Sequence, residues 1–96
     1  MPCVFSPHAA IDLEDIGDYI ARENPERAVT FILEMKERCD KIAATPRAFP
    51  LRPELGEGFR MMVFKSYLVF YRIDGDTVRI ERVLHGARNI QALFDA

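Results

Sequence analysis

Apolar positions recur at helical spacing in the first half of the chain and run almost without interruption in the second half. Between residues 7 and 44 they return every three or four positions, which predicts two amphipathic helices. Each helix has a start signal in which a capping residue precedes a proline, at residues 6–7 and 24–25. Because the second start follows the first helix at once, we expect an antiparallel helical hairpin. A short strand is expected before it, at residues 2–6.

The second half of the chain predicts a sheet. Residues 46–58 contain three prolines and two glycines and are expected to form a loop. The β candidates that follow are residues 59–64, 67–73 and 77–85. Asp74, Gly75 and Asp76 are a strong hairpin signal, whereas the first turn, Lys65 and Ser66, has no residue that favours positive φ, and this leaves the register open. The expected fold is α+β, with an N-terminal strand and an antiparallel helical hairpin packed on an antiparallel sheet of three to four strands.

Both faces of the middle strands are apolar. Tyr67 and Val69 alternate with Leu68 and Phe70, whereas a sheet with one wet face alternates apolar and polar residues. The helical hairpin can cover one face only, and several large apolar side chains left in water forgo several kcal/mol in a domain of about 5 to 10 kcal/mol stability. We therefore expect a partner chain on the open face. The alternative is that edge strands and the 46–58 loop fold over it.

Composition is typical of a soluble globular protein. Of the 96 residues, 49% are apolar and 29% charged, which suits one domain spanning residues 1–96. No stretch approaches the roughly 20 apolar residues of a membrane-spanning helix, and the N-terminus has no basic region followed by an apolar core, so a cytoplasmic location is expected. Cys3 and Cys39 show no metal or redox spacing, and we expect two reduced, buried thiols.

The charge is divided unevenly along the chain. Residues 1–46 carry nine acidic and five basic residues, whereas residues 47–96 carry eight basic and six acidic residues. Seven of those eight bases are arginines, which can grip carboxylate, phosphate or backbone groups with two hydrogen bonds. The second half is therefore expected to hold the working surface. Its positive excess is small for a protein that binds a phosphate backbone, so direct DNA binding by this chain alone is not expected.

Few side chains offer chemistry. His85 would need a nucleophile and an orienting group nearby to act as a general base, whereas Ser6 and Ser66 are expected in a cap and a turn. The alternative for His85 is a strand-end histidine bonded to the backbone. No metal-ligand cluster, paired carboxylates or phosphate loop occurs in the sequence, so no cofactor and no metal are expected.

Arginines near the last strand are more informative. Arg82 stands where the alternation of its strand requires an apolar residue, which indicates a β-bulge or a deliberately placed charge. Arg88 follows Gly86, which permits a sharp exit from the strand. These arginines, with Arg60, either tie the C-terminal segment to the sheet or bind a partner.

Three segments, taken in order, carry a resemblance to a known family. They are AAIDLEDIGDYIARENPERA across the expected helical hairpin, YLVFYRI in the middle strand and VRIERVLHGAR at the last strand. The ordered set resembles the ParE branch of the RelE/ParE toxin superfamily over nearly the whole chain. The resemblance implies the toxin of a type II toxin–antitoxin pair, held inactive by a small ParD-like antitoxin whose C-terminal segment wraps it.

The superfamily contains two activities. RelE-like members resemble ribosome-dependent mRNA endonucleases that use basic side chains on the sheet and a C-terminal aromatic hydroxyl or histidine. Arg60 and Arg88 fall on basic positions of that pattern. Met62 and Leu68, however, replace further basic residues, and Phe94 replaces the catalytic tyrosine. This departure disfavours nuclease chemistry and favours the ParE branch, whose members resemble inhibitors of DNA gyrase.

The ParE resemblance implies two surfaces and no catalytic residue. The target-binding surface would contain Arg60, Arg82, His85, Arg88 and Phe94, and the antitoxin would cover Met62, Phe64, Leu68 and Phe70. Two alternatives stay open. One is a RelE-like nuclease that uses His85 in place of the tyrosine, and the other is a member without toxic activity that serves as an antitoxin-binding module.

Overall fold

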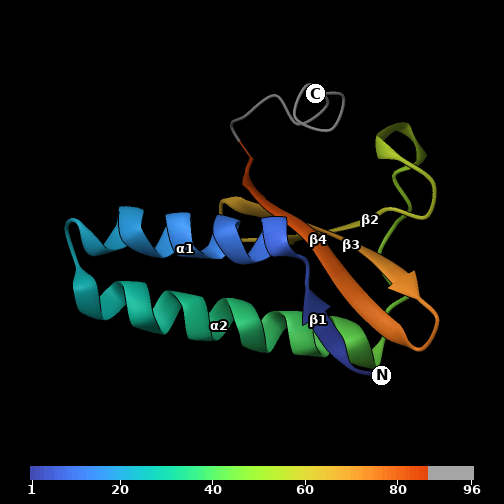
Figure 1. Cartoon of the computed structure of the whole chain (residues 1–96), viewed down its shortest axis with the longest axis horizontal. Coiled ribbons are helices and arrows are strands. Elements are labelled where there is room, and N and C mark those ends of the chain that lie inside the picture. Colours follow the sequence, from blue (N-terminus) through green and yellow to red (C-terminus); the bar gives the residue numbers. More distant parts are fainter. Residues whose placement is uncertain (87–96) are drawn as a thin grey trace.

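The computed structural model describes residues 1–86. Its elements are, in order, β1 (Cys3–Phe5), α1 (Pro7–Ala21), α2 (Pro25–Ala44), the short 3-10 helix η1 (Pro53–Leu55), β2 (Arg60–Phe64), β3 (Tyr67–Asp74) and β4 (Thr77–His85). Figure 1 shows the two helices side by side, running in opposite directions, with the sheet packed across them. The predicted helical hairpin on a sheet is confirmed.

Both helices begin where the capping residues predict. The Ser6 side chain accepts a hydrogen bond from the backbone N–H of Ala9 at 3.0 Å, and Asn24 accepts one from the N–H of Arg27 at 3.0 Å. Each cap satisfies a backbone donor that has no partner within its helix, and the proline after it has no donor to satisfy. The two caps therefore fix the starts of both helices locally, before any tertiary contact.

The sheet has four strands in the order β1-β4-β3-β2 and is mixed. β2, β3 and β4 form an antiparallel meander, but β1 pairs with β4 in parallel, with Val4 opposite Arg79. The expectation of a wholly antiparallel sheet is therefore wrong at this edge. Parallel neighbours require a long connection, and the helical hairpin with the first two meander strands supplies it.

The register of β2 and β3 decides which apolar side chains face the helices. Lys65 takes a positive φ of 53° in the tight turn between these strands, a conformation that its residue type does not signal. In the resulting pairing Met62 lies opposite Val69 and Phe64 lies opposite Tyr67. Met62 and Phe64 are consequently buried in the core against the helices, at 2% and 5% exposure.

The expected antitoxin-contact set is therefore split by the sheet. Leu68 and Phe70 lie on the other face from Met62 and Phe64, because successive residues of a strand point to opposite faces. The sequence left the register of β2 and β3 open, and the pairing in the structure does not bring these four residues to one face. Met62, Phe64 and Phe70 are buried and not accessible to a partner in this structure, whereas the contact role of the partly exposed Leu68 stays a prediction.

The face away from the helices is more sheltered than the sequence indicates. Phe70 is 0% exposed and Leu84 is 3% exposed, whereas Val63 on the same face is 55% exposed. The expectation that this whole face is open is therefore wrong at its centre. Among the described residues, exposure of large apolar side chains on it is confined to the two edge strands, at Val63 of β2 and at Val4 of β1, which is 43% exposed.

The 46–58 loop packs on the chain instead of projecting from it. The Tyr71 hydroxyl donates to the carbonyl of Pro46 at 2.6 Å, and Arg60 Nη1 donates to the carbonyl of Phe49 at 2.7 Å. Leu51 forms an isolated antiparallel bridge with Arg60 and so covers part of the free edge of β2. The loop thereby protects this edge from pairing with another chain. Its contacts with Arg60 and Tyr71 lie at the edge and on the helix-facing side, so they do not bear out the alternative that the loop folds over the open face.

Candidate functional site

A β-bulge interrupts β4 at the point where the sequence places Arg82. Tyr71 lies opposite Ile80, but Phe70 lies opposite Arg82, so Glu81 is an extra residue in the ladder. The bulge exchanges the faces of the strand, and Val83 takes the helix-facing position that simple alternation would give to Arg82. The predicted bulge is confirmed, and its consequence is that a charged residue arrives at the border of the core.

Ser6 holds the bulge to the start of α1. Its backbone N–H donates to the carbonyl of Ile80 at 2.9 Å, and its hydroxyl donates to the carbonyl of Glu81 at 2.8 Å while accepting from Ala9. Ser6 is 5% exposed and has all of these groups paired. One side chain therefore caps the helix and satisfies the carbonyl that the bulge removes from the ladder.

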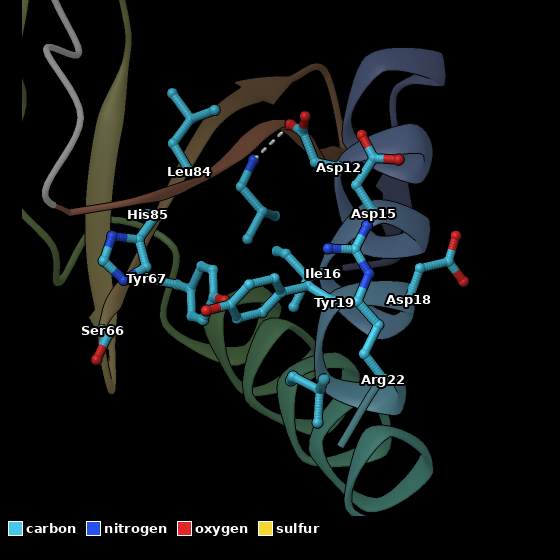
Figure 2. Close-up of a pocket in the computed structure, with 12 residues that line it drawn as sticks. Asp12, Asp15, Ile16, Asp18, Tyr19, Arg22, Ser66, Tyr67, Leu84 and His85 are labelled. Atoms are coloured by element: carbon cyan, nitrogen blue, oxygen red, sulfur yellow. Dashed lines mark hydrogen bonds between the residues drawn. The ribbon is translucent and has the colours of Figure 1, made fainter. Parts of the chain in front are cut away.

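Asp12 of α1 binds the residue that follows the bulge. Arg82 Nε and Nη2 donate to the two oxygens of Asp12 at 2.8 and 3.0 Å, and the backbone N–H of Val83 donates to Asp12 Oδ2 at 3.0 Å. Figure 2 shows the last of these bonds as a dashed line. The side chains of Arg82 and Asp12 are 25% and 12% exposed, and the bond to Asp12 raises the pKa of Arg82. The placed charge is thus part of an internal clamp between α1 and β4.

A groove lies beside this clamp, between α1 and the ends of β3 and β4. Its volume is about 690 Å³. Its lining residues are Asp12, Asp15, Ile16, Asp18, Tyr19, Ile20, Arg22, Ser66, Tyr67, Val83, Leu84 and His85. We call it the α1–β4 groove. Its floor is apolar and aromatic, and carboxylates line one wall. A partner in this groove can therefore make charged or hydrogen-bonded contacts in addition to apolar ones.

Aromatic rings line the α1–β4 groove from both sides. Figure 2 shows Tyr19 from α1 and Tyr67 from β3 pointing toward one another, with Asp12, Asp15 and Asp18 following one another along the helix. Tyr67 is held by Phe31, with ring centroids 5.5 Å apart at 64°. Tyr19, by contrast, is 66% exposed. One aromatic wall is therefore fixed by the core and the other stands in solvent.

His85 stands at the strand end that borders this groove. It is exposed and contacts Tyr67 edge to face, with centroids 5.3 Å apart at 88°. Arg60 lies elsewhere, bonded to the 46–58 loop. Arg88 and Phe94, the other residues of the expected target-binding surface, lie outside the described residues. The structure thus brings Arg82 and His85 to one region and separates Arg60 from them, and the binding role of each stays a prediction.

Several groove residues escaped the sequence-based prediction. Asp12, Asp15 and Asp18 recur at three-residue spacing, with Tyr19 and Arg22 next on the same side of the helix. That spacing was a readable signal for one shared face. The sequence could not show that the end of β4 lies opposite this face, because the contact joins residues about 70 positions apart.

The two thiols are not poised to react. Cys39 is buried and Cys3 is only partly buried, which corrects the expectation of two buried thiols. Burial raises the pKa of Cys3 to about 11 and that of Cys39 to about 12, so both stay protonated and unreactive at neutral pH. Within residues 1–86 no group of three or more metal-binding side chains occurs. No helix in that range is long and apolar enough to cross a membrane.

Comparison with known families matches this fold to a toxin. A family model described as "ParE toxin of type II toxin-antitoxin system, parDE" matches residues 3–90. The chain belongs to the ParE toxin family. Relatives named Toxin ParE1, from two strains of Mycobacterium tuberculosis, are 33% identical to it over 84 residues, covering 85% of this chain and 86% of theirs. The resemblance drawn from the sequence is confirmed, and this ParE-family chain is the toxin of a type II toxin–antitoxin system.

A solved structure supports the fold independently of close sequence similarity. A chain of the "Chromosomal ParDE TA system from P. aeruginosa" superposes with a TM-score of 0.78 at 22% sequence identity. The match covers 88% of this chain and 95% of the other. The helical hairpin and the four-stranded mixed sheet are therefore shared with a member of a ParDE system.

Proposed function

We propose that this ParE-family toxin acts by binding DNA gyrase, and that a ParD-like antitoxin holds it inactive in the cytoplasm. Membership of the family, together with a similar fold in a chromosomal ParDE system, supports an antitoxin partner. Gyrase inhibition is the activity that the resemblance to the ParE branch implies. It requires a binding surface and no catalytic group of its own.

The observation that carries the choice against nuclease chemistry is the engagement of the arginines. Arg82 is neutralised by two hydrogen bonds to Asp12, and Arg60 donates to carbonyls of the 46–58 loop. Stabilising the extra negative charge on a phosphate in a transition state requires positive groups that face the substrate. The Arg82 guanidinium, bound to an internal carboxylate, contributes little net charge. The Arg60 guanidinium keeps its charge but donates to carbonyls of its own chain. Both arginines therefore support a structural role and a toxin that acts by binding.

One observation favours the RelE-like alternative. His85 is exposed at the end of β4 and lies against Tyr67, so an imidazole and a phenol stand together at the edge of the α1–β4 groove. A neutral imidazole can accept a proton from a ribose hydroxyl that lies within hydrogen-bond reach. This pair is the basis on which mRNA cleavage remains the second candidate function.

A supercoiling assay separates these functions. Purified gyrase, relaxed plasmid and ATP are mixed with toxin freed from its antitoxin, and in parallel the toxin is added to a translation reaction with a defined mRNA. We expect loss of supercoiling with intact mRNA. Cleaved mRNA together with normal supercoiling would replace the gyrase proposal with the nuclease alternative, and His85→Ala would then abolish cleavage. Inhibition of neither reaction would leave the antitoxin-binding module.

A further inference from the structure

The first helix has an unusual charge for its position. α1 (Pro7–Ala21) contains four acidic residues and no lysine or arginine, its last turn includes Asp18, and the first base of either kind is the C-cap, Arg22. The C-terminal end of a helix carries partial negative charge, so a carboxylate there is unfavourable by a few tenths of a kcal/mol. A local choice that opposes stability is expected where a surface serves recognition.

Two of the three acidic side chains of the groove have no partner among the described residues. Within residues 1–86 the carboxylates of Asp15 and Asp18 make no hydrogen bond or ion pair, in contrast to Asp12, which is bound to Arg82. Arg22 is the base that lines the groove with them. With two unpaired carboxylates and one guanidinium, the wall formed by α1 has a net negative charge beside the groove.

The opposite wall is aromatic and rigid. Tyr67 is held between Phe31 and His85 by ring contacts of 5.5 and 5.3 Å, and its ring points toward Tyr19 across the groove. Carboxylates beside aromatic faces attract a cationic side chain twice, through the charge and through the ring quadrupole. Neutral or acidic side chains gain nothing comparable there.

We propose that the α1–β4 groove seats an arginine or lysine side chain of the antitoxin, between Tyr19 and Tyr67 and against Asp15 and Asp18. This inference deepens the proposed function, because it rests on the existence of the antitoxin and names the chemistry that the toxin recognises in it. The charge on α1 selects a basic segment as the occupant, and the apolar floor of Ile16 and Val83 selects apolar neighbours for the cation.

The test uses the intact toxin–antitoxin complex, produced by co-expression. A fluorophore on the antitoxin and an unlabelled antitoxin chase give the dissociation rate, and titration gives Kd at 50 and 300 mM NaCl. We expect Asp15→Asn/Asp18→Asn to weaken binding at least about tenfold at the lower salt and to speed dissociation, because a seated cation loses its counter-charge. The salt dependence of Kd should fall at the same time.

A matched control removes the same charge elsewhere. Glu14→Gln/Glu57→Gln deletes two exposed carboxylates, one on another side of α1 and one in the 46–58 loop, and should leave the dissociation rate within twofold of wild type. Tyr19→Phe should bind like wild type and Tyr19→Leu should bind several-fold more weakly, since only the ring attracts the cation. Tyr19 is exposed, so neither change perturbs the core.

Failure of the proposed antitoxin seat and failure of the gyrase proposal give different results in these measurements. Equal dissociation rates for the Asp15/Asp18 variant and the control would overturn the seat, as would a change confined to the association rate, which indicates steering alone. Loss of gyrase inhibition with antitoxin binding intact would assign the groove to the target and also overturn it. A wild-type toxin that does not inhibit gyrase would overturn the proposed function while leaving the antitoxin measurement interpretable.

Discussion

The two helices are built alike but present different surfaces. α2 carries four acidic and four basic residues, and among these Arg27 pairs with Glu34 and Lys41 with Glu37. α1 carries four acidic residues and no lysine or arginine, and its ion pair is made to a strand, at Asp12. Local pairing on α2 serves the helix itself. On α1, by contrast, Asp12 pairs with Arg82 of β4, whereas Asp15 and Asp18 have no ion pair among the described residues.

The Asp12 clamp should contribute most to stability. Asp12→Ala leaves the Arg82 guanidinium and the Val83 N–H without their acceptor, in a pair whose Arg82 and Asp12 side chains are 25% and 12% exposed. We expect the free energy of unfolding to fall by about 2–3 kcal/mol, below the range for fully buried pairs because some solvent reaches Arg82. Urea denaturation measures this. Asp15→Ala on the same helix should cost under about 0.5 kcal/mol, and equal losses would contradict the assigned role of Asp12.

The cap of α1 should contribute more to the free energy of unfolding than the cap of α2. Ser6 both caps α1 and donates to Glu81 in a buried site, so Ser6→Ala should lower the free energy of unfolding by about 2 kcal/mol. Ser66→Ala, in an exposed turn, is the control and should be nearly neutral. A loss of only a few tenths of a kcal/mol for Ser6→Ala would show that the bond to the bulge contributes nothing.

The cap of α2 is exposed and acts only on its own helix. Asn24→Ala removes the bond to the Arg27 N–H and should cost about 1 kcal/mol, roughly half of the effect at Ser6. Thermal unfolding followed by circular dichroism compares the two variants. An Asn24 variant that is less stable than the Ser6 variant would reverse the comparison between a local cap and one joined to the sheet.

The smallest expected changes in stability have opposite signs: a charge change on α1 should stabilise the chain, and one on α2 should destabilise it. Asp18→Lys replaces an acid with a base in the last turn of α1 and should stabilise the chain by about 0.5 kcal/mol. Glu34→Gln removes an exposed pair from α2 and should destabilise it by a similar or smaller amount. Chemical denaturation at low salt resolves these differences in a matched series. Destabilisation by Asp18→Lys would mean that the acid supports the fold and that its placement needs no functional reason.

The sequence predicted where helices, strands and turns occur better than it predicted features that depend on contacts between them. Caps at Ser6 and Asn24 and the glycine turn at Gly75 act over a few residues, and each was readable in the chain. The bulge near Arg82 was readable as a break in alternation. Lys65 was not, because a lysine at positive φ is held by the strands that it joins and not by its own preference.

The candidate site also contains residues that the sequence identified and residues that it did not. His85 and Arg82 were found as polar residues that break an apolar pattern, whereas Asp12 and Tyr19 were missed although they share one helical face. A polar residue on an exposed helix face is ordinary until something lies opposite it. The same limit explains the misplaced Met62 and Phe64, whose face depends on a turn that the sequence left undetermined.

By itself the sequence determined the helices, the meander and the family, because periodicity, caps and turn residues act locally and the ordered motifs act together. Only the tertiary structure decided which sheet face is buried, that β1 joins β4 in parallel, and that the acidic side of α1 borders a groove. These depend on contacts between residues far apart in the chain, such as Asp12 and Arg82, whose pairing depends on register and packing across the whole fold.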